Sequence, residues 1–327
     1  MRLEFIPKEM KEEKSSQEVL IPLNAIELDP LSLRRTYGVS LFYGKDKLTK
    51  IQYKIDLIYK KETEDENFII EIQKQELYIN EKRVSSSVDL LMEKCGEVLY
   101  PLEISVNKNL KFLEIANHST IVKRWEYLKK EIKKSFEGNF ADSIIDETSK
   151  ILSDSDAIKR KLVENDWFYI LFFNPVGTRN FEQHLPLIAN KRGIAYTFRN
   201  TAHYHIKRKR DIVIHKQGTC TDERSEQEIF QGKTISNENE NQVSGKSNFT
   251  YQIFRGSNLV DVIIGEVELR FPSNKKEFVK VEIFNLRNEI PKTNQEKANQ
   301  KDQELEKDIK EKKKKKKYFL FGKEIKI

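Results

Sequence analysis

Hydrophobic and polar residues alternate along the first third of the chain. Between Ile51 and Tyr59 every second residue is apolar, which is typical of a β-strand with one solvent-facing side. A similar alternation runs from Phe68 to Ile79, and its change of phase at Gln73 to Gln75 predicts a β-bulge. The next β-rich runs are Val98–Val106 and Leu110–Ile115. The Asn-Lys-Asn between them tolerates left-handed backbone, so these two runs predict a hairpin.

The pattern then changes to helical spacing. Apolar residues recur at steps of three and four at Ile121, Trp125, Leu128, Ile132 and Phe136. This stripe predicts an amphipathic helix that Gly138 ends in the left-handed conformation. A second stripe from Phe140 to Leu152 predicts another helix, and Asp154 to Asp156 are suited to cap a third helix that runs through Leu162.

The last part of the chain returns to β-rich sequence. The continuous apolar run from Trp167 to Phe173 predicts a strand that is buried on both faces. Further predicted strands are Ile194–Phe198, Tyr204–His215, Phe249–Phe254, Leu259–Phe271 and Phe278–Leu286. Residues 218–247 are rich in Thr, Ser, Asn, Glu and Gln, which predicts a long mobile loop that cannot bury enough apolar surface to order itself.

These elements predict an α+β body over residues 1–291, followed by a Lys-rich tail over residues 292–327. The order is strands (37–116), helices (118–165) and strands again (167–286), without the β-α alternation of parallel sheets. We therefore expect a mainly antiparallel curved sheet with a central insertion of two to three helices packed on it. Such an arrangement can resemble the half-barrels of lipoprotein carriers, on the order of elements alone.

Charge is concentrated at the end of the chain. The 327 residues carry a net charge of +7, and residues 292–327, with 13 lysines and 7 acidic residues, account for +6 of it. The body is therefore close to neutral, which argues against specific nucleic-acid binding through a basic folded surface. The two cysteines form no disulfide framework, and the sequence has no signal-peptide pattern and no long apolar run, so a cytoplasmic location is expected.

Few residues show the spacing of a catalytic or metal site. His203 and His205 share one face of a predicted strand, and Cys220 could join them on zinc or act as a nucleophile with His215 or His205. No third ligand stands at an informative spacing, and phosphate-loop, Gly-x-Ser-x-Gly and His-Glu-x-x-His motifs are absent. We therefore predict no catalytic residue, no metal and no cofactor. The basic run Lys207–Arg210 is better explained as a charged edge strand than as a phosphate site.

The tail contains the candidate partner-binding residues. A run of six lysines precedes a short apolar segment, and the candidates are Lys312, Lys313, Lys314, Lys315, Lys316, Lys317, Tyr318, Phe319 and Phe321. Such a segment could contact an anionic membrane or bind nucleic acid nonspecifically. It could also add as a strand to this protein's sheet or to a partner's edge. We favour strand addition, because residues 318–327 are β-prone and end with apolar residues at alternate positions.

Part of the helical region resembles a known group of proteins. In the segment from Ile104 to Phe173, residues 118–125 open a helix, and Asp166, Trp167 and Phe168 open the next element. This segment resembles uncharacterised Bacteroidota proteins encoded near type VI-like contractile injection genes. The resemblance covers a minor part of the chain and carries over no catalytic residue. It implies an accessory, adaptor or cargo-associated role.

Together these observations predict a non-enzymatic protein-binding or accessory/adaptor protein, linked through the resemblance to a contractile secretion apparatus. The alternative is a carrier that holds a lipid or small apolar ligand between sheet and helices, and an unrecognised enzyme comes third. The space between sheet and helices distinguishes the first two. A packed interface favours the binding protein, and an apolar cavity favours the carrier.

Overall fold

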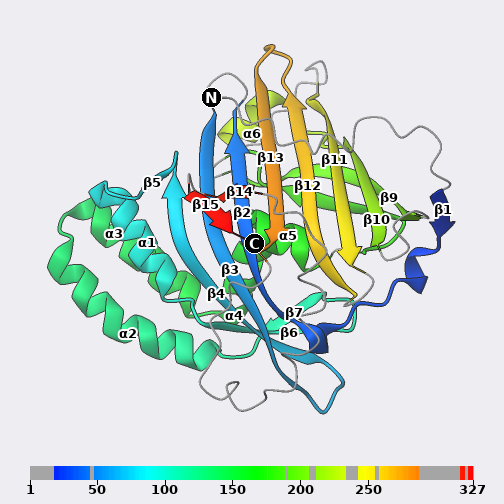
Figure 1. Ribbon diagram of the computed structural model, residues 1–327. Helices are drawn as coiled ribbons and strands as arrows, with labels where there is room; N and C mark the ends of the chain where they lie inside the picture. Colours follow the sequence, from blue (N-terminus) through cyan, green and yellow to red (C-terminus); the bar gives the residue numbers. More distant parts are fainter. Residues whose placement is uncertain are drawn as a thin grey trace.

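A 13-stranded antiparallel sheet organises the chain (Figure 1). The computed structural model describes residues 18–44, 48–174, 176–188, 191–205, 211–232, 242–254, 258–286, 317–320 and 323–326. The sheet contains β1 (Glu18–Ile21), β2 (Arg34–Tyr43), β3 (Thr49–Glu62), β4 (Phe68–Ile79), β5 (Lys82–Arg83), β6 (Leu102–Val106), β7 (Phe112–Ile115), β8 (Asn180–Leu185), β9 (Ile194–His205), β10 (Asp211–Cys220), β11 (Ser244–Phe254), β12 (Leu259–Arg270) and β13 (Lys276–Asn285). A separate two-stranded sheet pairs β14 (Lys317–Leu320) with β15 (Lys323–Lys326).

The helices follow the central strands in the sequence. They are α1 (Ser87–Glu97), α2 (His118–Ser135), α3 (Asn139–Leu152), α4 (Ser155–Asn165), α5 (Trp167–Phe172) and α6 (Glu226–Gln231), with 3-10 turns η2 (Leu23–Ala25) and η3 (Pro30–Ser32) near the start. No described helix is long and apolar enough to cross a membrane. The α+β class and the mainly antiparallel pairing are as predicted.

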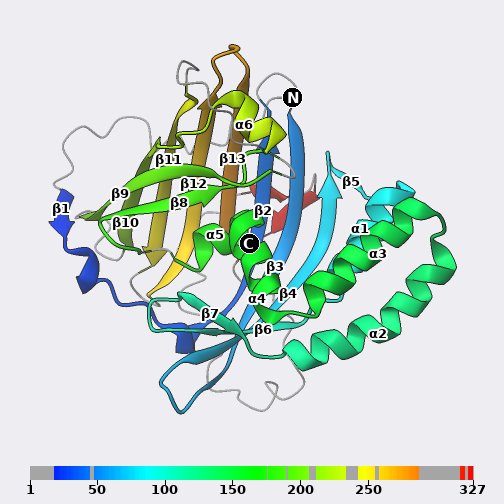
Figure 2. The same cartoon turned by 180° about the vertical axis from the view of Figure 1, so that it is seen from behind.

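The strand order joins the two β-rich halves of the chain into one sheet. It runs β1-β9-β10-β11-β12-β13-β2-β3-β4-β6-β7, with β5 on β4 and β8 on β9. The halves meet where β13 pairs with β2, with Val39 opposite Ile283. One edge of β9 carries both β8, opposite residues 194–199, and β1, opposite residues 202–205. The long strands curve across the molecule in Figures 1 and 2.

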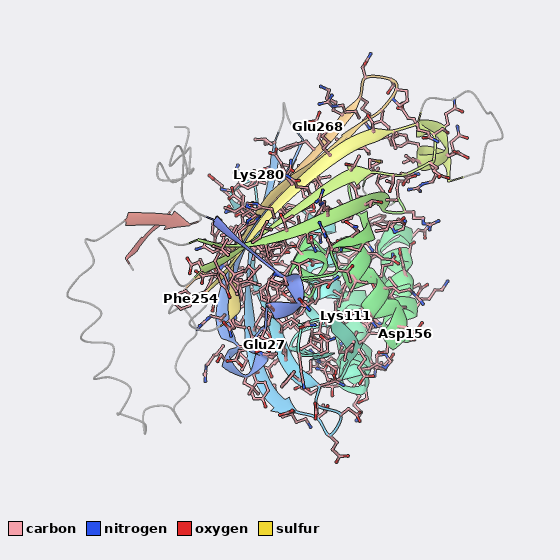
Figure 3. The ribbon with its side chains drawn as sticks, turned by 90° about the vertical axis from the view of Figure 1, so that its right-hand side faces the viewer. Glu27, Lys111, Asp156, Phe254, Glu268 and Lys280 are labelled. Atoms are coloured by element: carbon pink, nitrogen blue, oxygen red, sulfur yellow. The ribbon has the colours of Figure 1, made fainter. Side chains whose placement is uncertain are left out.

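The two faces of the sheet differ in polarity because the side chains alternate along each strand. On β13, Val279, Val281 and Ile283 are buried, whereas Lys280 and Glu282 form an ion pair of 2.7 Å on the other face. The view along the sheet in Figure 3 places Lys280 and Asp156 of α4 on opposite sides of it. The helices therefore cover the apolar face and leave the polar face to solvent.

The two helices predicted from apolar stripes and the third predicted from its capping residues are confirmed. Ile121, Trp125 and Ile132 of α2 are buried, and Asp154 caps α4 by accepting a hydrogen bond from Asp156 N at 2.9 Å. The prediction for Gly138 was wrong in detail. Helix α2 ends at Ser135, and Gly138, with φ +103°, is the residue before α3.

The apolar run from Trp167 to Phe173 is a helix and not the predicted strand. All six residues of α5 are 0–2% exposed, and Asp166 caps the helix by accepting a hydrogen bond from Phe168 N at 2.9 Å. Rings of α5 contact Tyr37 of β2 and Phe249 of β11. A helix that is buried on every side has no polar stripe, so its sequence carries no helical period.

The predicted mobile loop over residues 218–247 is largely ordered where it is described. Strand β10 continues to Cys220, and Ser225 begins α6 with a capping box in which Ser225 and Glu228 bond each other's backbone. The side chain of Ile229 is buried, and β11 begins at Ser244. The polar composition therefore reflects capping and a solvent-facing strand side as much as loop. Residues 233–241 lie outside the described residues.

The strand predictions in the first half are nearly correct. The hairpin of β6 and β7 is confirmed, with Asn107 Oδ1 accepting hydrogen bonds from two backbone amides of the turn, those of Asn109 and Lys111. The bulge in β4 lies just beyond the predicted position, because Gln52 pairs with Tyr78 while Lys54 pairs with Gln75. Val98 was predicted to begin a strand, but it directly follows α1. Helix α1 itself is not among the predicted elements.

The helices cover the sheet only in part. Helix α5 lies against it, with α4 beside α5 (Figure 2). Helix α2 instead packs on α3, and the two lie with α1 near β4 and β5 (Figure 1). The predicted helical insertion is therefore divided into a buried part and a peripheral part, and the peripheral part leaves a groove.

Candidate functional site

The predicted tail residues are only partly described. Lys312–Lys316 and Phe321 lie outside the described residues. Lys317, Tyr318 and Phe319 belong to β14, which pairs with β15 in register Lys317 opposite Lys326. The tail strand thus pairs with its own continuation and not with the 13-stranded sheet. Addition to the protein's own sheet is not found, and addition to a partner stays a prediction.

The histidine and cysteine candidates do not form a metal centre among the described residues. No described group of three or more His, Cys, Asp or Glu side chains is arranged to hold an ion. His203 lies beside His215, with ring centroids 5.8 Å apart, on the polar face of β9 and β10. Cys220 is five residues from His215 on the same strand, so the two side chains point to opposite faces. The backbone of His205 ends β9, and Lys207–Arg210 lie outside the described residues.

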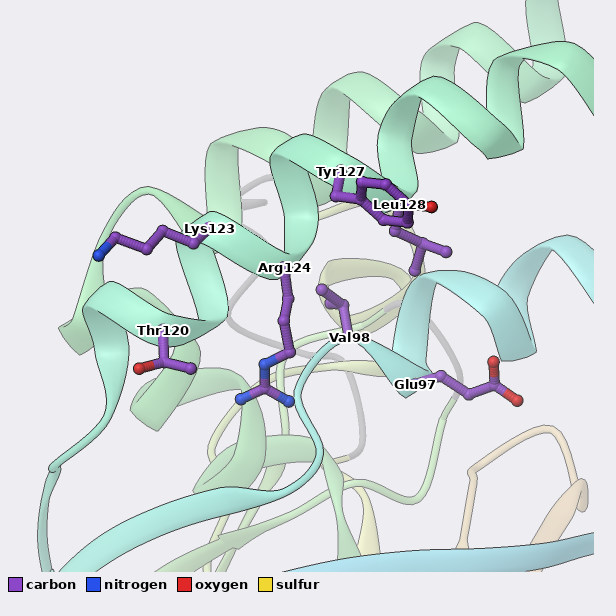
Figure 4. Close-up of a pocket in the computed structure, with 7 residues that line it drawn as sticks. All are labelled: Glu97, Val98, Thr120, Lys123, Arg124, Tyr127 and Leu128. Carbon is purple, nitrogen blue, oxygen red and sulfur yellow. The ribbon is translucent and has the colours of Figure 1, made fainter.

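A surface groove lies between the end of α1 and the outer flank of α2 (Figure 4). Its volume is about 460 Å³, and its exposed lining is almost entirely apolar. The lining residues are Glu97, Val98, Thr120, Lys123, Arg124, Tyr127 and Leu128. The side chain of Leu128 projects from α2 toward α1 in Figure 4, and the ring of Tyr127 overlies it in this view. A groove of this size can take one or two large apolar side chains.

The groove is fixed by contacts on each of its walls. Helix α1 is capped by Ser86, whose hydroxyl accepts a hydrogen bond from Asp89 N at 3.1 Å, and it buries Leu91 and Cys95. The guanidinium of Arg124 donates to the carbonyls of Tyr100 and Pro101, in the turn that follows α1. Arg124 therefore holds α2 at a set distance from α1, and the groove exists before any ligand binds.

The rim of the groove is polar and predominantly basic on the α2 side. Tyr127 is 68% exposed, and a hydrogen bond to Glu131 raises the pKa of its phenol. Lys123, Lys130 and Lys134 are exposed at helical intervals on the same flank as Tyr127. On the α1 side, Glu97 is paired with Lys94 at 3.0 Å. An exposed tyrosine beside an apolar groove with a polar rim is typical of a protein-binding surface.

A second cluster of ionisable side chains surrounds Asp166. Its carboxylate accepts a hydrogen bond from Tyr53 OH at 3.3 Å and lies 3.7 Å from Lys74 Nζ. Burial lowers the pKa of Lys74, whereas the nearby carboxylate of Asp166 raises it. The pKa of Lys74 therefore lies above its usual value. Burial raises the pKa of Tyr53. Each of these contacts serves to cap and anchor α5, so the cluster is explained by structure.

A third ionisable group, Lys216, is buried on the apolar face of the sheet. It is 1% exposed, and its amine donates a hydrogen bond to Gln183 Oε1 at 2.9 Å. Burial lowers the pKa of Lys216 to about 7. The sequence hardly marks this residue, because lysines are seldom buried and a lysine in a strand is expected on the exposed side.

Comparison with known proteins finds no family model and no curated protein that matches this sequence. A solved structure entitled "Lipid-protein interactions in lipovitellin" is similar with a TM-score of 0.35 and 8% sequence identity. The similarity covers 80% of this chain and 25% of that chain, so the chain spans about a quarter of the length of the protein it matches.

Proposed function

We propose that this protein is a non-enzymatic binding protein that holds a segment of a partner protein in the groove between α1 and α2. The groove is the observation that carries this proposal, because its apolar lining is open to solvent and its walls are fixed by Arg124. Apolar surface that a protein maintains at an open groove, with a polar rim around it, is typical of a protein-interaction site.

The charge of the rim favours an acidic partner segment. Lys123 lines the groove, and Lys130 and Lys134 continue along the same flank of α2, where Glu131 is bonded to Tyr127. Glu97 on the α1 side is already paired with Lys94. A helix that places one or two large apolar side chains in the groove and carboxylates over the lysines would match both features. We therefore commit to an amphipathic acidic helix as the occupant.

The carrier alternative has less support. The apolar face of the sheet is filled at its centre by α5, where Phe168 and Phe172 stack with ring centroids 4.9 Å apart. Phe172 also contacts Tyr37 of the sheet at 4.9 Å. Such packing favours the binding protein over the carrier. The link to a contractile secretion apparatus stays a proposal that rests on the sequence resemblance.

A synthetic peptide tests this function directly. The probe is a fluorescent helical peptide with Leu and Phe on one face and Glu on the other, and the comparison peptide has the same residues in scrambled order. We expect the helical peptide to bind the full chain at least tenfold more tightly in fluorescence anisotropy. Equal affinity for the two peptides would contradict the proposal, because only the helical one presents an apolar face.

Two exposed aromatic residues provide a matched pair of variants. Tyr127 lies in the groove and is 68% exposed, and Phe140 of α3 is 57% exposed and does not line it. Tyr127→Ser should weaken peptide binding at least tenfold, and Phe140→Ser should leave it unchanged. Lys123→Glu should weaken binding mainly at low salt, because exposed charges are screened at high ionic strength. An equal loss in both serine variants would place the binding site elsewhere.

A further inference from the structure

The buried amine of Lys216 lies on the apolar face of the sheet and contacts β8, an edge strand that pairs with β9. Lys216 is directly opposite Asn200 of β9 and Phe249 of β11. Its neighbours on the same side of β10 are Ile214 and Gly218. The ammonium form of such a lysine loses almost all of its hydration, which is costly unless a counter-charge replaces the water.

The contacts of the amine come chiefly from β8. Gln183 of β8 accepts its hydrogen bond at 2.9 Å, and the ring of Phe181, also of β8, lies with its centroid 4.7 Å from Lys216 Nζ. The ring of Phe198 of β9 lies 4.8 Å away and stacks on Phe181. Gln183 is itself oriented by a hydrogen bond of 3.4 Å to Ile170 O in α5.

These neighbours provide no counter-charge. The side chains that β8, β9 and β11 present to Lys216 are Phe181, Gln183, Phe198, Asn200 and Phe249, and none of them ionises. Titratable groups on the same face include Tyr196, Tyr251 and Cys220, whose pKa values burial raises, so their phenols and thiol remain neutral. On β8 the ionisable residues Glu182 and His184 alternate with Gln183 and point the other way. Burial alone lowers the pKa of Lys216 to about 7.

Among the strands around Lys216, β8 can separate from the sheet most easily. Strands β9, β10 and β11 are each paired on both sides, whereas β8 pairs only with β9 among the described strands. Asn180 and Glu182 of β8 are exposed, and Phe181 and Gln183 are half-buried. Local opening of a short edge strand requires less free energy than unfolding of the central strands. Water would reach Lys216 once β8 had moved.

We propose that β8 is a strap that proton uptake by Lys216 releases from the sheet. At alkaline pH the neutral amine donates to Gln183 and β8 stays on β9. When the amine takes up a proton, the ammonium is hydrated most easily if β8 separates, and this exposes the edge of β9 at residues 194–199. The strap thereby couples acidification to an open sheet edge, which is a surface on which another strand can pair.

Hydrogen exchange on the full chain tests the strap. Protection factors of the β8 amides, corrected for the intrinsic pH dependence of exchange, are measured between pH 8.5 and pH 5.5, with the β12 amides as reference. We expect β8 protection to fall by roughly tenfold for each pH unit from 8.5 to 7 and to level off below 7, where the closed form also binds the proton, while β12 protection changes little. A pH-independent protection of β8 in the wild-type chain would overturn the proposal.

Two lysine variants identify the responsible group. Lys216→Met keeps most of the length of the side chain and cannot take up a proton, so β8 should stay protected at pH 5.5. The control is Lys280→Met, which removes an exposed lysine on the polar face and should retain the wild-type pH dependence. If Lys216→Met does not fold, Lys216→Gln takes its place with the same expectation. Loss of β8 protection at low pH in the Lys216 variant would assign the transition to another group and overturn the proposal.

Discussion

The indole of Trp125 donates a hydrogen bond of 3.0 Å to the hydroxyl of Ser149, and this contact joins α2 to α3. Ser149 in turn donates to Ile145 O at 2.7 Å, within its own helix. Trp125 is 2% exposed, so its ring fills the interface between the two helices while its single polar atom is satisfied. The outer wall of the groove depends on this interface, because α2 does not lie on the sheet.

Replacing Trp125 should therefore destabilise the protein. Trp125→Ala leaves a cavity and removes the hydrogen bond, and we expect a loss of about 3 to 5 kcal/mol in the free energy of unfolding. Trp125→Phe keeps most of the apolar volume and should lose about half as much. Urea denaturation followed by circular dichroism measures both values. A melt of Trp125→Ala that equals the wild type would show that the ring is not part of the core.

A helix could be predicted from the sequence where one of its sides is polar, because apolar and polar residues then alternate with the helical period. Helix α2 alternates a buried stripe at Ile121, Trp125 and Ile132 with charged residues, so its period is visible. Helix α5 lies between sheet and helices on every side, and its residues resemble those of a buried strand. What identifies α5 is the cap at Asp166, a single residue whose role depends on the conformation that follows it.

Asp166 should contribute more to the free energy of unfolding through its helix cap than through its ion pair. Asp166→Asn keeps a side-chain oxygen for Phe168 N and should lose about 1 kcal/mol or less, because Lys74 and Asp166 are both partly exposed. Asp166→Ala removes the cap as well and also leaves Tyr53 OH without its acceptor, so we expect a loss of about 2 to 3 kcal/mol. Equal losses in the two variants, measured by urea denaturation, would assign the effect to the charge.

The stability of the protein should depend on pH through Lys216. The pKa of this amine is about 7 in the folded chain and 10.5 in the unfolded chain. Between these values only the unfolded chain binds the proton, so wild-type stability rises with pH across this window, by roughly 1 kcal/mol per pH unit. Below pH 7 the folded chain also binds the proton and bears the full cost of burying the charge. Opening of β8 would limit this cost.

Lys216→Met removes this dependence. The variant should exceed the wild type in stability most at pH 6, and the difference should shrink as the pH approaches 10.5. Because other groups titrate in both proteins, the measured quantity is the difference between their free energies of unfolding at each pH. Lys280→Met is again the control, since its side chain is exposed. A constant difference across the range would mean that Lys216 has an ordinary pKa.

The groove could not be predicted from the sequence, although the exposure of some of its residues could. Tyr127 and Lys123 lie off the apolar stripe of α2, which marks them as solvent-facing. On the other wall, Glu97 ends α1 and Val98 follows it, at the position where the sequence predicts the start of a strand. The groove arises from tertiary contacts of Arg124 with a turn that is distant in sequence. No local pattern records such a contact.

The tail provides the last prediction, because its candidate residues include β14. This strand pairs with β15, and a two-stranded hairpin has two outer edges that can pair with another chain. Deletion of residues 292–327 should leave a folded protein, since the 13-stranded sheet contains no residue of the tail. The deleted chain should capture fewer protein partners in a cross-linked pull-down and keep the affinity of the full chain for the acidic peptide.

Liposome and nucleic-acid binding separate this prediction from the electrostatic alternatives. Six consecutive lysines could attract an anionic membrane at about 1 kcal/mol per lysine, or bind nucleic acid with a steep dependence on salt. At physiological salt we expect the deletion to change neither binding to phosphatidylserine vesicles nor binding to random-sequence DNA by more than about twofold. If the deletion abolishes vesicle binding and leaves every protein contact intact, the tail is a membrane anchor, and strand addition to a partner is wrong.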